Sequence, residues 1–267
     1  MKPLGDLRDR RRYWHPDSLS GHRVIVTGAA QGVGRGITAA LLERGAAVLL
    51  VDRNPAVADV AEAFGGHGYR AEHLVADLCD HSSYRQIVDT AVDRLGGLDA
   101  LVNNAIATNE PKPFTDITTD DFDLVFDTGP RATLFLMQSA YPVLKAGGGG
   151  SIVNLGSGSG TGGQVAFGAY AAAKEAIRGM SKVAALEWGA DNVRVNVVCP
   201  FANSEGVQGW SQAFPEVYQG ILKGNPLRRI GDTHDDIGAT VAFLLSDDAS
   251  YLNAQTIHID GGMGSFR

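Results

Sequence analysis

The sequence has little cysteine, no long hydrophobic run and no excess of positive charge, and each shortage excludes a class of protein. Its two cysteines, Cys79 and Cys199, lie far apart, which predicts buried thiols in a reducing compartment such as the cytoplasm rather than a disulfide framework. No run approaches the roughly 18 uncharged apolar residues of a membrane span. The formal net charge of −7 repels phosphate backbones, so nucleic acid is a poor candidate as a partner.

Metal-ligand spacings and a secretion signal are also missing. The seven histidines form no HExxH or comparable pattern, so we predict no catalytic metal. Residues 1–12 carry five basic and two acidic side chains, but the apolar core of a signal peptide does not follow them. We interpret residues 1–20 as a basic arm that lies on the surface or on a partner subunit, and a disordered tail explains the composition equally well.

The sequence does have the composition and pattern of one α/β domain. It is 44% hydrophobic and 20% charged, which is typical of a soluble globular chain. Its apolar runs alternate with helical patterns, and they are continuous, as in parallel strands that are buried on both faces. We therefore predict a single-domain, Rossmann-like, doubly wound fold over residues 21–267, with helices on both faces of a seven-stranded parallel sheet. The predicted strands are 24–26, 47–51, 73–76, 100–102, 151–155, 193–198 and 256–259.

A glycine-rich turn follows the first predicted strand. Residues 27–34 read TGAAQGVG and open a helix, so the backbone can approach a pyrophosphate whose charge the helix N-terminus favours. Asp52 ends the second strand, 18 residues after this turn, and completes the pattern of a dinucleotide site. The turn residues assigned to that site are Gly28, Gln31, Gly32, Val33 and Gly34.

The ends of the following strands supply the rest of the predicted dinucleotide site. The Asp52 carboxylate can accept hydrogen bonds from both hydroxyls of the adenosine ribose and would repel a 2′-phosphate, which favours NAD over NADP. Arg53 keeps NADP open, because a neighbouring arginine can hold that phosphate. The remaining assignments are Asp77 and Leu78 beside the adenine, and Asn104 and Ala105 beside the ribose.

These residues together resemble the short-chain dehydrogenase/reductase family over about residues 20–263. The resemblance implies an NAD(P)-dependent enzyme that interconverts alcohols and carbonyls (EC 1.1.1.-), with a small-molecule substrate and a homodimeric or homotetrameric assembly. It implies that Ser157, Tyr170 and Lys174 are the catalytic residues. The motifs that carry it are TGAAQGVG, Asp77, Asn103-Asn104-Ala105, Ser157, the Tyr170–Lys174 pair and Asp260-Gly261-Gly262.

The chemistry of the Tyr170–Lys174 pair can be argued from its spacing. Residues four apart share one face of a helix. A phenol titrates near 10, but a nearby ammonium and an oxidised nicotinamide would lower the pKa of Tyr170. Tyr170 could then take a proton from an alcohol, or return it to a carbonyl, while hydride moves to or from the nicotinamide. Tyr170 and Lys174 would also border the nicotinamide ribose, and Ser157, with Ser159 as its rival, would hydrogen-bond the substrate oxygen.

Two departures from the family lie beside this chemistry. The family has an Asn in the helix before the catalytic strand, where it braces a water chain to the lysine. Residues 110–153 contain no Asn, and Gly129 stands in its place. Gly129-Pro130 should also interrupt that helix, and a water or Thr128 would have to substitute in the relay. The family has Gly where this chain has Ile106, so the backbone near the nicotinamide must find more room.

The segment after the sixth strand departs as well. The family expects Pro-Gly and a Thr five residues after the proline, but Pro200 is followed by Phe, and Glu205, which cannot copy the Thr, takes its position. We assign Pro200 and Asn203 to the nicotinamide end of the site, with Ser204 as the alternative to Asn203. The apolar residues spaced along 201–225 predict a lid over a largely apolar, cyclic or aromatic substrate, and packing on the domain is the alternative.

The sequence thus predicts an NAD-dependent oxidoreductase that acts on a secondary alcohol or the matching ketone. One alternative keeps the chemistry but uses NADPH as a ketone reductase. The other is a dinucleotide-binding sensor or assembly protein with little turnover, which the changes at Gly129 and after Pro200 motivate. The retention of Ser157, Tyr170 and Lys174 favours catalysis.

Overall fold

The protein, seen as a computed structural model, is built on one seven-stranded parallel sheet with the strand order β3-β2-β1-β4-β5-β6-β7. The structure describes residues 17–264, apart from the side chains of Gly206, Trp210, Ala213 and Val217. Most of the predicted basic arm therefore lies outside the described residues. The strands are β1 (Arg23–Thr27), β2 (Ala47–Asp52), β3 (Ala71–Val75), β4 (Ala100–Asn103), β5 (Gly150–Leu155), β6 (Val193–Pro200) and β7 (Thr256–Ile259).

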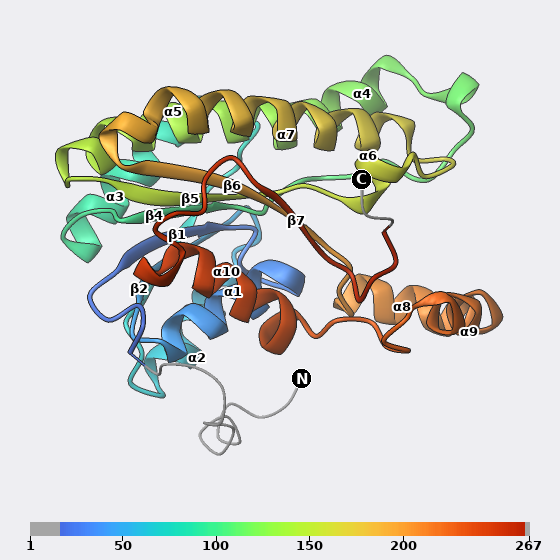
Figure 1. Cartoon of the computed structure of the whole chain (residues 1–267), viewed down its shortest axis with the longest axis horizontal. Coiled ribbons are helices and arrows are strands. Elements are labelled where there is room, and N and C mark those ends of the chain that lie inside the picture. Colours follow the sequence, from blue (N-terminus) through green and yellow to red (C-terminus); the bar gives the residue numbers. More distant parts are fainter. Residues whose placement is uncertain (1–16, 265–267) are drawn as a thin grey trace.

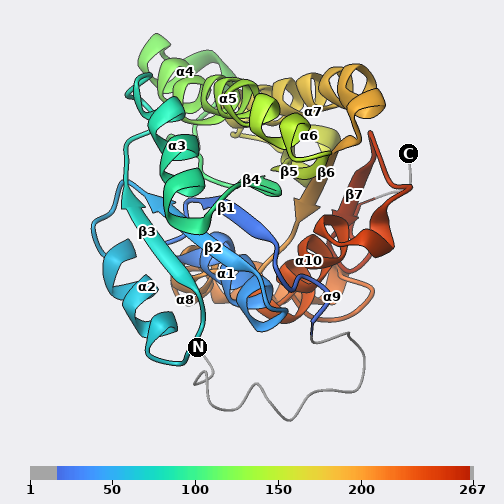
Figure 2. The same ribbon diagram turned by 90° about the vertical axis from the view of Figure 1, so that its left-hand side faces the viewer.

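Helices cover both faces of the sheet, as the sequence predicted. On one face lie α1 (Gly32–Glu43), α2 (Val57–Gly65) and α10 (Ala239–Leu245), and on the other lie α3 (Ser83–Leu95), α5 (Ala132–Ala146) and α7 (Gly168–Trp188) (Figures 1 and 2). The remaining α-helices are α4 (Thr119–Phe126), α6 (Gly158–Gly162), α8 (Glu205–Ala213) and α9 (Pro215–Gly224). Short 3₁₀ turns are η2 (Phe114–Asp116), η4 (Gly189–Asp191) and η6 (Asp247–Ala249), and π-helical turns are η3 (Asp127–Arg131) and η5 (Thr233–Gly238).

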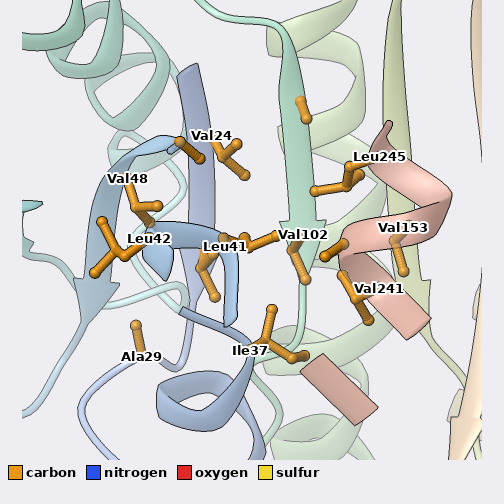
Figure 3. Close-up of a cluster of buried hydrophobic side chains, with 14 of the residues drawn as sticks. Val24, Ala29, Ile37, Leu41, Leu42, Val48, Val102, Val153, Val241 and Leu245 are labelled. Atoms are coloured by element: carbon orange, nitrogen blue, oxygen red, sulfur yellow. The ribbon is translucent and has the colours of Figure 1, made fainter. Parts of the chain in front are cut away.

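The core has two layers, one on each face of the sheet. In the first layer, valines of β1, β2, β4 and β5 point toward Ile37 and Leu41 of α1 and toward Val241 and Leu245 of α10 (Figure 3). Each fully buried aliphatic side chain of this kind contributes roughly 1.5–3 kcal/mol to folding. The central strands β1, β2 and β4 are short and mainly apolar, as expected of strands that helices cover on both faces.

The edge strands differ from the prediction of full burial. The side chains of β3 and β7 are half-buried or exposed, whereas β1, β2 and β4 are almost wholly buried. An edge strand has a neighbour on one side only, so solvent reaches part of its surface. The third strand also runs from Ala71 to Val75 and thus begins two residues earlier than predicted.

Two further segments add detail to the sequence analysis. Gly129-Pro130 does not break the helix it lies in, because the chain stays helical from α4 through the π turn η3 into α5. Leu19, at the end of the predicted arm, is fully buried in the first core layer, and its amide donates to the Arg44 carbonyl. In the described part of the chain, none of the helices has the length and hydrophobicity that crossing a bilayer requires.

Candidate active site

A cleft of about 750 Å³ opens beyond the carboxyl ends of the strands. Residues that follow β1, β2, β3, β4, β5 and β6 line it, so it lies where the strand order reverses between β1 and β4. Its volume is in the range of small-molecule and cofactor sites. The predicted site residues that line it are Gly28, Gln31, Gly32, Val33, Asp52, Arg53, Asp77, Leu78, Asn104, Ala105, Tyr170, Lys174 and Pro200.

The glycine turn brings the backbone close to the cleft. Gly28 has φ +66°, and a Cβ there would lie 2.8 Å from Asn104 Nδ2. A Cβ at Gly34 would lie 2.1 Å from the Gly28 carbonyl oxygen, so this glycine allows α1 to pack against the turn although it does not line the cleft. The α1 N-terminus has no side-chain cap from Gln31 and no acidic residue in its first turn. Its amides therefore need an acceptor from elsewhere.

Glu205 provides that acceptor from the far end of the chain. One carboxylate oxygen accepts a hydrogen bond of 2.9 Å from the Gly32 amide, and the other forms an ion pair with Arg35. The Glu205 side chain is 50% exposed and lines the cleft. A carboxylate thus stands at the helix N-terminus where the sequence predicts a pyrophosphate, and an anionic ligand would have to displace it.

Asp52 is held at the opposite end of the turn. One oxygen accepts from the Ala30 amide at 3.0 Å and the other from the Asn54 amide at 2.9 Å, and each keeps a second lone pair. The carboxylate is thereby fixed at the cleft beside Arg53. Farther along the wall, Asp77 accepts from the Cys79 amide at 2.9 Å.

The asparagines after β4 connect neighbouring strands. Asn104 Nδ2 donates to the carbonyls of Thr27 and Gly28 at 2.9 and 3.2 Å, which fixes the glycine turn against β4. Asn103 Nδ2 donates to Asn154 Oδ1 at 2.8 Å inside the sheet. These contacts hold the glycine turn and the central strands together at the cleft.

Tyr170 and Lys174 come together at the inner end of the cleft, on α7. The Lys174 ammonium lies 5.5 Å from the centre of the Tyr170 ring and donates a hydrogen bond of 2.7 Å to the Leu155 carbonyl. Lys174 is 3% exposed. Ser157 caps α6, its hydroxyl accepting from the Ser159 amide at 3.1 Å, and it interacts with Tyr170 without lining the cleft.

Burial dominates the electrostatics of this pair. It lowers the pKa of Lys174 to about 8, because the charged ammonium loses its hydration. It raises the pKa of Tyr170, while the Ser157 hydroxyl acts in the opposite direction. Desolvation is thus the largest influence on the phenol in the protein alone, whereas the expected fall in the pKa of Tyr170 applies to a complex with oxidised nicotinamide.

Gly129 and Ile106, where the sequence predicts departures from the family pattern, lie next to each other at the cleft. Gly129 lies buried on the π turn, and Ile106 and Thr128 line the cleft in front of it. The Thr128 hydroxyl donates to the Leu124 carbonyl at 2.8 Å and accepts from the Ala107 amide at 2.9 Å. Thr128 thus holds the loop after β4 against the π turn.

The segment after β6 is attached at both ends. Its two helices, α8 and α9, stand at one end of the molecule (Figure 1). Glu205 ties the start of α8 to α1, and the buried Asn225 after α9 donates to the Asp260 carbonyl at 2.9 Å. Ser204 and Glu205 line the cleft, whereas Asn203 does not.

The sequence analysis assigned no role to several residues that line the cleft. Leu155 ends β5 and Gly156 follows it, and the Leu155 carbonyl is a backbone group that no side-chain motif reveals. Glu205 had a signal, since it is an acid at a helix start where the family has Thr, but its partners are 170 and 173 residues away. The sequence pattern therefore does not predict the contact of Glu205 with Gly32 and Arg35.

Comparisons with known proteins agree over nearly the whole chain. The family model described as Enoyl-(Acyl carrier protein) reductase matches residues 28–264. A 12alpha-hydroxysteroid dehydrogenase from Clostridium sp. is 38% identical over 254 residues, which cover 92% of this chain and 98% of that protein.

Solved structures give the same result. A protein described as a short-chain alcohol dehydrogenase from Sinorhizobium meliloti superimposes with a TM-score of 0.87 at 34% identity, covering 93% of this chain and 98% of that one. A protein described as an NAD(P)-dependent gluconate 5-dehydrogenase from Beutenbergia cavernae, with bound NADP, has a TM-score of 0.87 at 31% identity, covering 93% and 99%. The chain is therefore similar to dehydrogenases that act on hydroxyl groups.

Proposed function

The chain belongs to the short-chain dehydrogenase/reductase family of NAD(P)-dependent enzymes that act on alcohol groups, and on this premise we propose that it interconverts a secondary alcohol and its ketone with NAD(H). The substrate we propose is largely apolar and cyclic, as a hydroxysteroid is. The observation that carries the proposal is the pairing of half-buried Tyr170 with buried Lys174 in the same cleft that the glycine turn lines.

The cleft suits a dinucleotide. Gly28 has no side chain at a position where a Cβ would clash with Asn104, so a ligand can approach its backbone. The amides at the start of α1 have no side-chain cap from Gln31. NAD rather than NADP is favoured by Asp52, whose carboxylate is fixed by two amides and would repel a 2′-phosphate. Two observations support the NADP alternative. Arg53 lines the cleft beside Asp52 and could hold a 2′-phosphate. The Beutenbergia cavernae protein was solved with NADP.

Each catalytic side chain has a defined task in this proposal. The nicotinamide, when bound, accepts or supplies the hydride. Tyr170 takes the hydroxyl proton during alcohol oxidation and returns it during ketone reduction. The Ser157 hydroxyl donates to the substrate oxygen as charge develops there, and it also favours the phenolate of Tyr170.

Lys174 supports the reaction by its charge and position. Its ammonium is held by the Leu155 carbonyl, so its long side chain is already ordered before a ligand binds. The cation and an oxidised nicotinamide ring would together lower the pKa of Tyr170 below the raised value that burial alone produces. Alcohol oxidation should therefore accelerate as the pH rises through the pKa of Tyr170 in the complex.

An apolar, cyclic substrate is supported by two features. The apolar side chains of Ile106 and Leu155 line the cleft together with Tyr170. The relative from Clostridium sp. is named for a hydroxysteroid, which is a fused-ring secondary alcohol. We propose the same substrate class for this chain.

We also propose a homodimer or homotetramer. The outer face of α7 exposes Val183 and Leu186 at 55% and 73%, and α5 exposes Phe135. Apolar side chains of this size are covered in an assembly. Light scattering on the purified protein gives the oligomeric state, and a monomer would contradict this part of the proposal.

A second candidate, a dinucleotide-binding protein with little turnover, is favoured by Glu205. Its carboxylate accepts a hydrogen bond from the Gly32 amide, where our proposal puts the cofactor phosphate, and would weaken cofactor binding. The two candidates separate in one experiment. The protein is titrated with NADH and NADPH by nicotinamide fluorescence, and oxidation is then measured with 3α-, 7α- and 12α-hydroxysteroids, cyclohexanol, sorbitol and gluconate.

Micromolar NADH binding, weaker NADPH binding and turnover of a hydroxysteroid are expected. Turnover of the polyols alone would reject the apolar substrate. Tighter binding of NADPH would reject the preference for NAD, and NADH binding without any turnover would favour the second candidate.

A further inference from the structure

Gly129 and Ile106, the two departures that the sequence shows separately, occupy the same space in the fold. A Cβ at Gly129 would lie 2.7 Å from Ile106 Cδ1, closer than side-chain carbons approach, and 3.2 Å from Ile106 Cγ1, which is a tight contact. The Ile106 side chain thus fills the volume in front of the π turn that a side chain at residue 129 would take. The room that Ile106 needs near the nicotinamide end comes from the missing side chain.

Ile106 has a second face toward the reacting groups. It lines the cleft together with Tyr170, and it packs on the small apolar cluster of Val125, Ala169 and Ala173, which the Tyr170 ring also joins. The absence of a side chain at Gly129 therefore determines where the Ile106 side chain lies. A substrate bound against Tyr170 would contact the other side of Ile106.

The surroundings of Lys174 agree with an apolar wall at this point. Among the described residues, its ammonium makes its hydrogen bond to the Leu155 carbonyl, on the strand side, at 2.7 Å. Toward the π turn, the Thr128 hydroxyl bonds to the Ala107 amide and the Leu124 carbonyl. No polar side chain at residue 129 reaches toward the pair, because Gly129 has none.

We propose that Ile106, seated over Gly129, is a positioning and specificity residue that forms the apolar wall beside Tyr170 and orients the ring system of a bulky alcohol or ketone. This inference rests on the proposed function, because it concerns the substrate of the same site. It explains why two changes that each look unfavourable occur together: a larger residue at 106 requires the smallest residue at 129.

The coupling between the two residues is tested with four variants. Gly129→Ala places a methyl group against Ile106 Cδ1, so the side chain must move toward the cleft. Ile106→Val removes Cδ1 and should make Gly129→Ala tolerable in the double variant. The matched control is Gly65→Ala at the end of α2, where a Cβ meets nothing within 4 Å. Ile106→Ala shortens the wall itself.

Thermal unfolding measures the coupling between residues 106 and 129 independently of enzyme turnover. Gly129→Ala should lower the melting temperature, the control should leave it unchanged or raise it, and Ile106→Val should restore most of the loss in the double variant. A Gly129→Ala variant as stable as the control, or a double variant with no recovery, would overturn the coupling.

Kinetics with cholate, a bulky 12α-hydroxysteroid, and with cyclohexanol read the specificity. Ile106→Ala should lower the ratio of kcat/KM for cholate over cyclohexanol about 10-fold, since one or two methylene contacts discriminate by about that factor. Gly129→Ala should lower kcat for cholate about 10-fold while NADH binding changes less than about 2-fold, and Ile106→Val should restore it. An unchanged ratio in Ile106→Ala overturns the specificity role. A parent enzyme that turns over neither alcohol contradicts the proposed function and this role together, while the melting temperatures still decide the coupling.

Discussion

The replacement Glu205→Gln should tighten the binding of NADH. The carboxylate accepts a hydrogen bond of 2.9 Å from the Gly32 amide. An anionic cofactor would need the same amide as a donor. Gln keeps the size and an acceptor oxygen but removes the negative charge. The ion pair with Arg35 is lost as well, so the arginine becomes available to attract the phosphates of the cofactor.

The size of the effect follows from exposure. Two unit charges about 4 Å apart interact by about 1 kcal/mol in water, and exposed ion pairs are measured at roughly 0.2–1 kcal/mol. Because the Glu205 side chain is 50% exposed, solvent screens its repulsion of the cofactor to this range. A change of about 0.6–1 kcal/mol corresponds to a Kd about 3- to 5-fold lower.

The assay is a nicotinamide fluorescence titration of the parent and the variant at about 0.05 M and 0.5 M salt. The gain should shrink at high salt, where the screening length falls well below 10 Å. The control is Glu216→Gln, an exposed acid in the first turn of α9 that does not line the cleft. An unchanged or higher Kd in Glu205→Gln, or an equal gain in the control, would refute the reasoning.

Two other predictions concern Asp52 and His234. Asp52→Ala should raise the Kd for NADH about 10-fold, because two charge-assisted ribose contacts are lost. The ratio of the Kd for NADPH to the Kd for NADH should fall by about the same factor. An unchanged ratio of the two Kd values would contradict the role of Asp52. The imidazole of His234 bonds to Glu43 and Asp235 at 2.8 Å each, and although burial opposes its charge, these partners raise its pKa above the ordinary value. Its stabilising contribution is therefore complete below about pH 6.5 and is lost as the pH rises through the raised pKa. Urea unfolding of the parent and of His234→Gln between pH 6 and 9 should show the advantage of the parent shrinking toward alkaline pH, and an advantage that does not change with pH would contradict this assignment.

The features that the sequence predicted well depend on local pattern. The strands from β1 to β7 were predicted from apolar-rich runs, and the central strands are buried because both faces are covered by helices. The glycine turn, Asp52 and the Tyr170–Lys174 spacing each follow from a single strand end or a single helix. Their convergence on one cleft is then a consequence of parallel strands ending at one edge of the sheet.

The features that the sequence did not predict depend on contacts between distant segments. Glu205 reaches Gly32 across 173 residues, and nothing in either local pattern points to the other. Ile106 and Gly129 looked like two unrelated losses because only the fold shows that they share one space. The raised pKa of Tyr170 in the protein alone comes from burial, which depends on the packing of α7 and which the Tyr170–Lys174 spacing does not reveal.

The central claim is that Tyr170 transfers the proton in an alcohol–ketone interconversion, and the most direct measurement compares Tyr170→Phe with the parent under saturating NAD and a hydroxysteroid alcohol. The account predicts that kcat falls by at least about 100-fold, the usual contribution of a general acid–base group, while the Kd for NADH stays within about 2-fold. The phenyl ring preserves the packing on Ala169 and Ala173, so the loss is assigned to the hydroxyl. Turnover that remains at the parent rate in Tyr170→Phe would contradict the account.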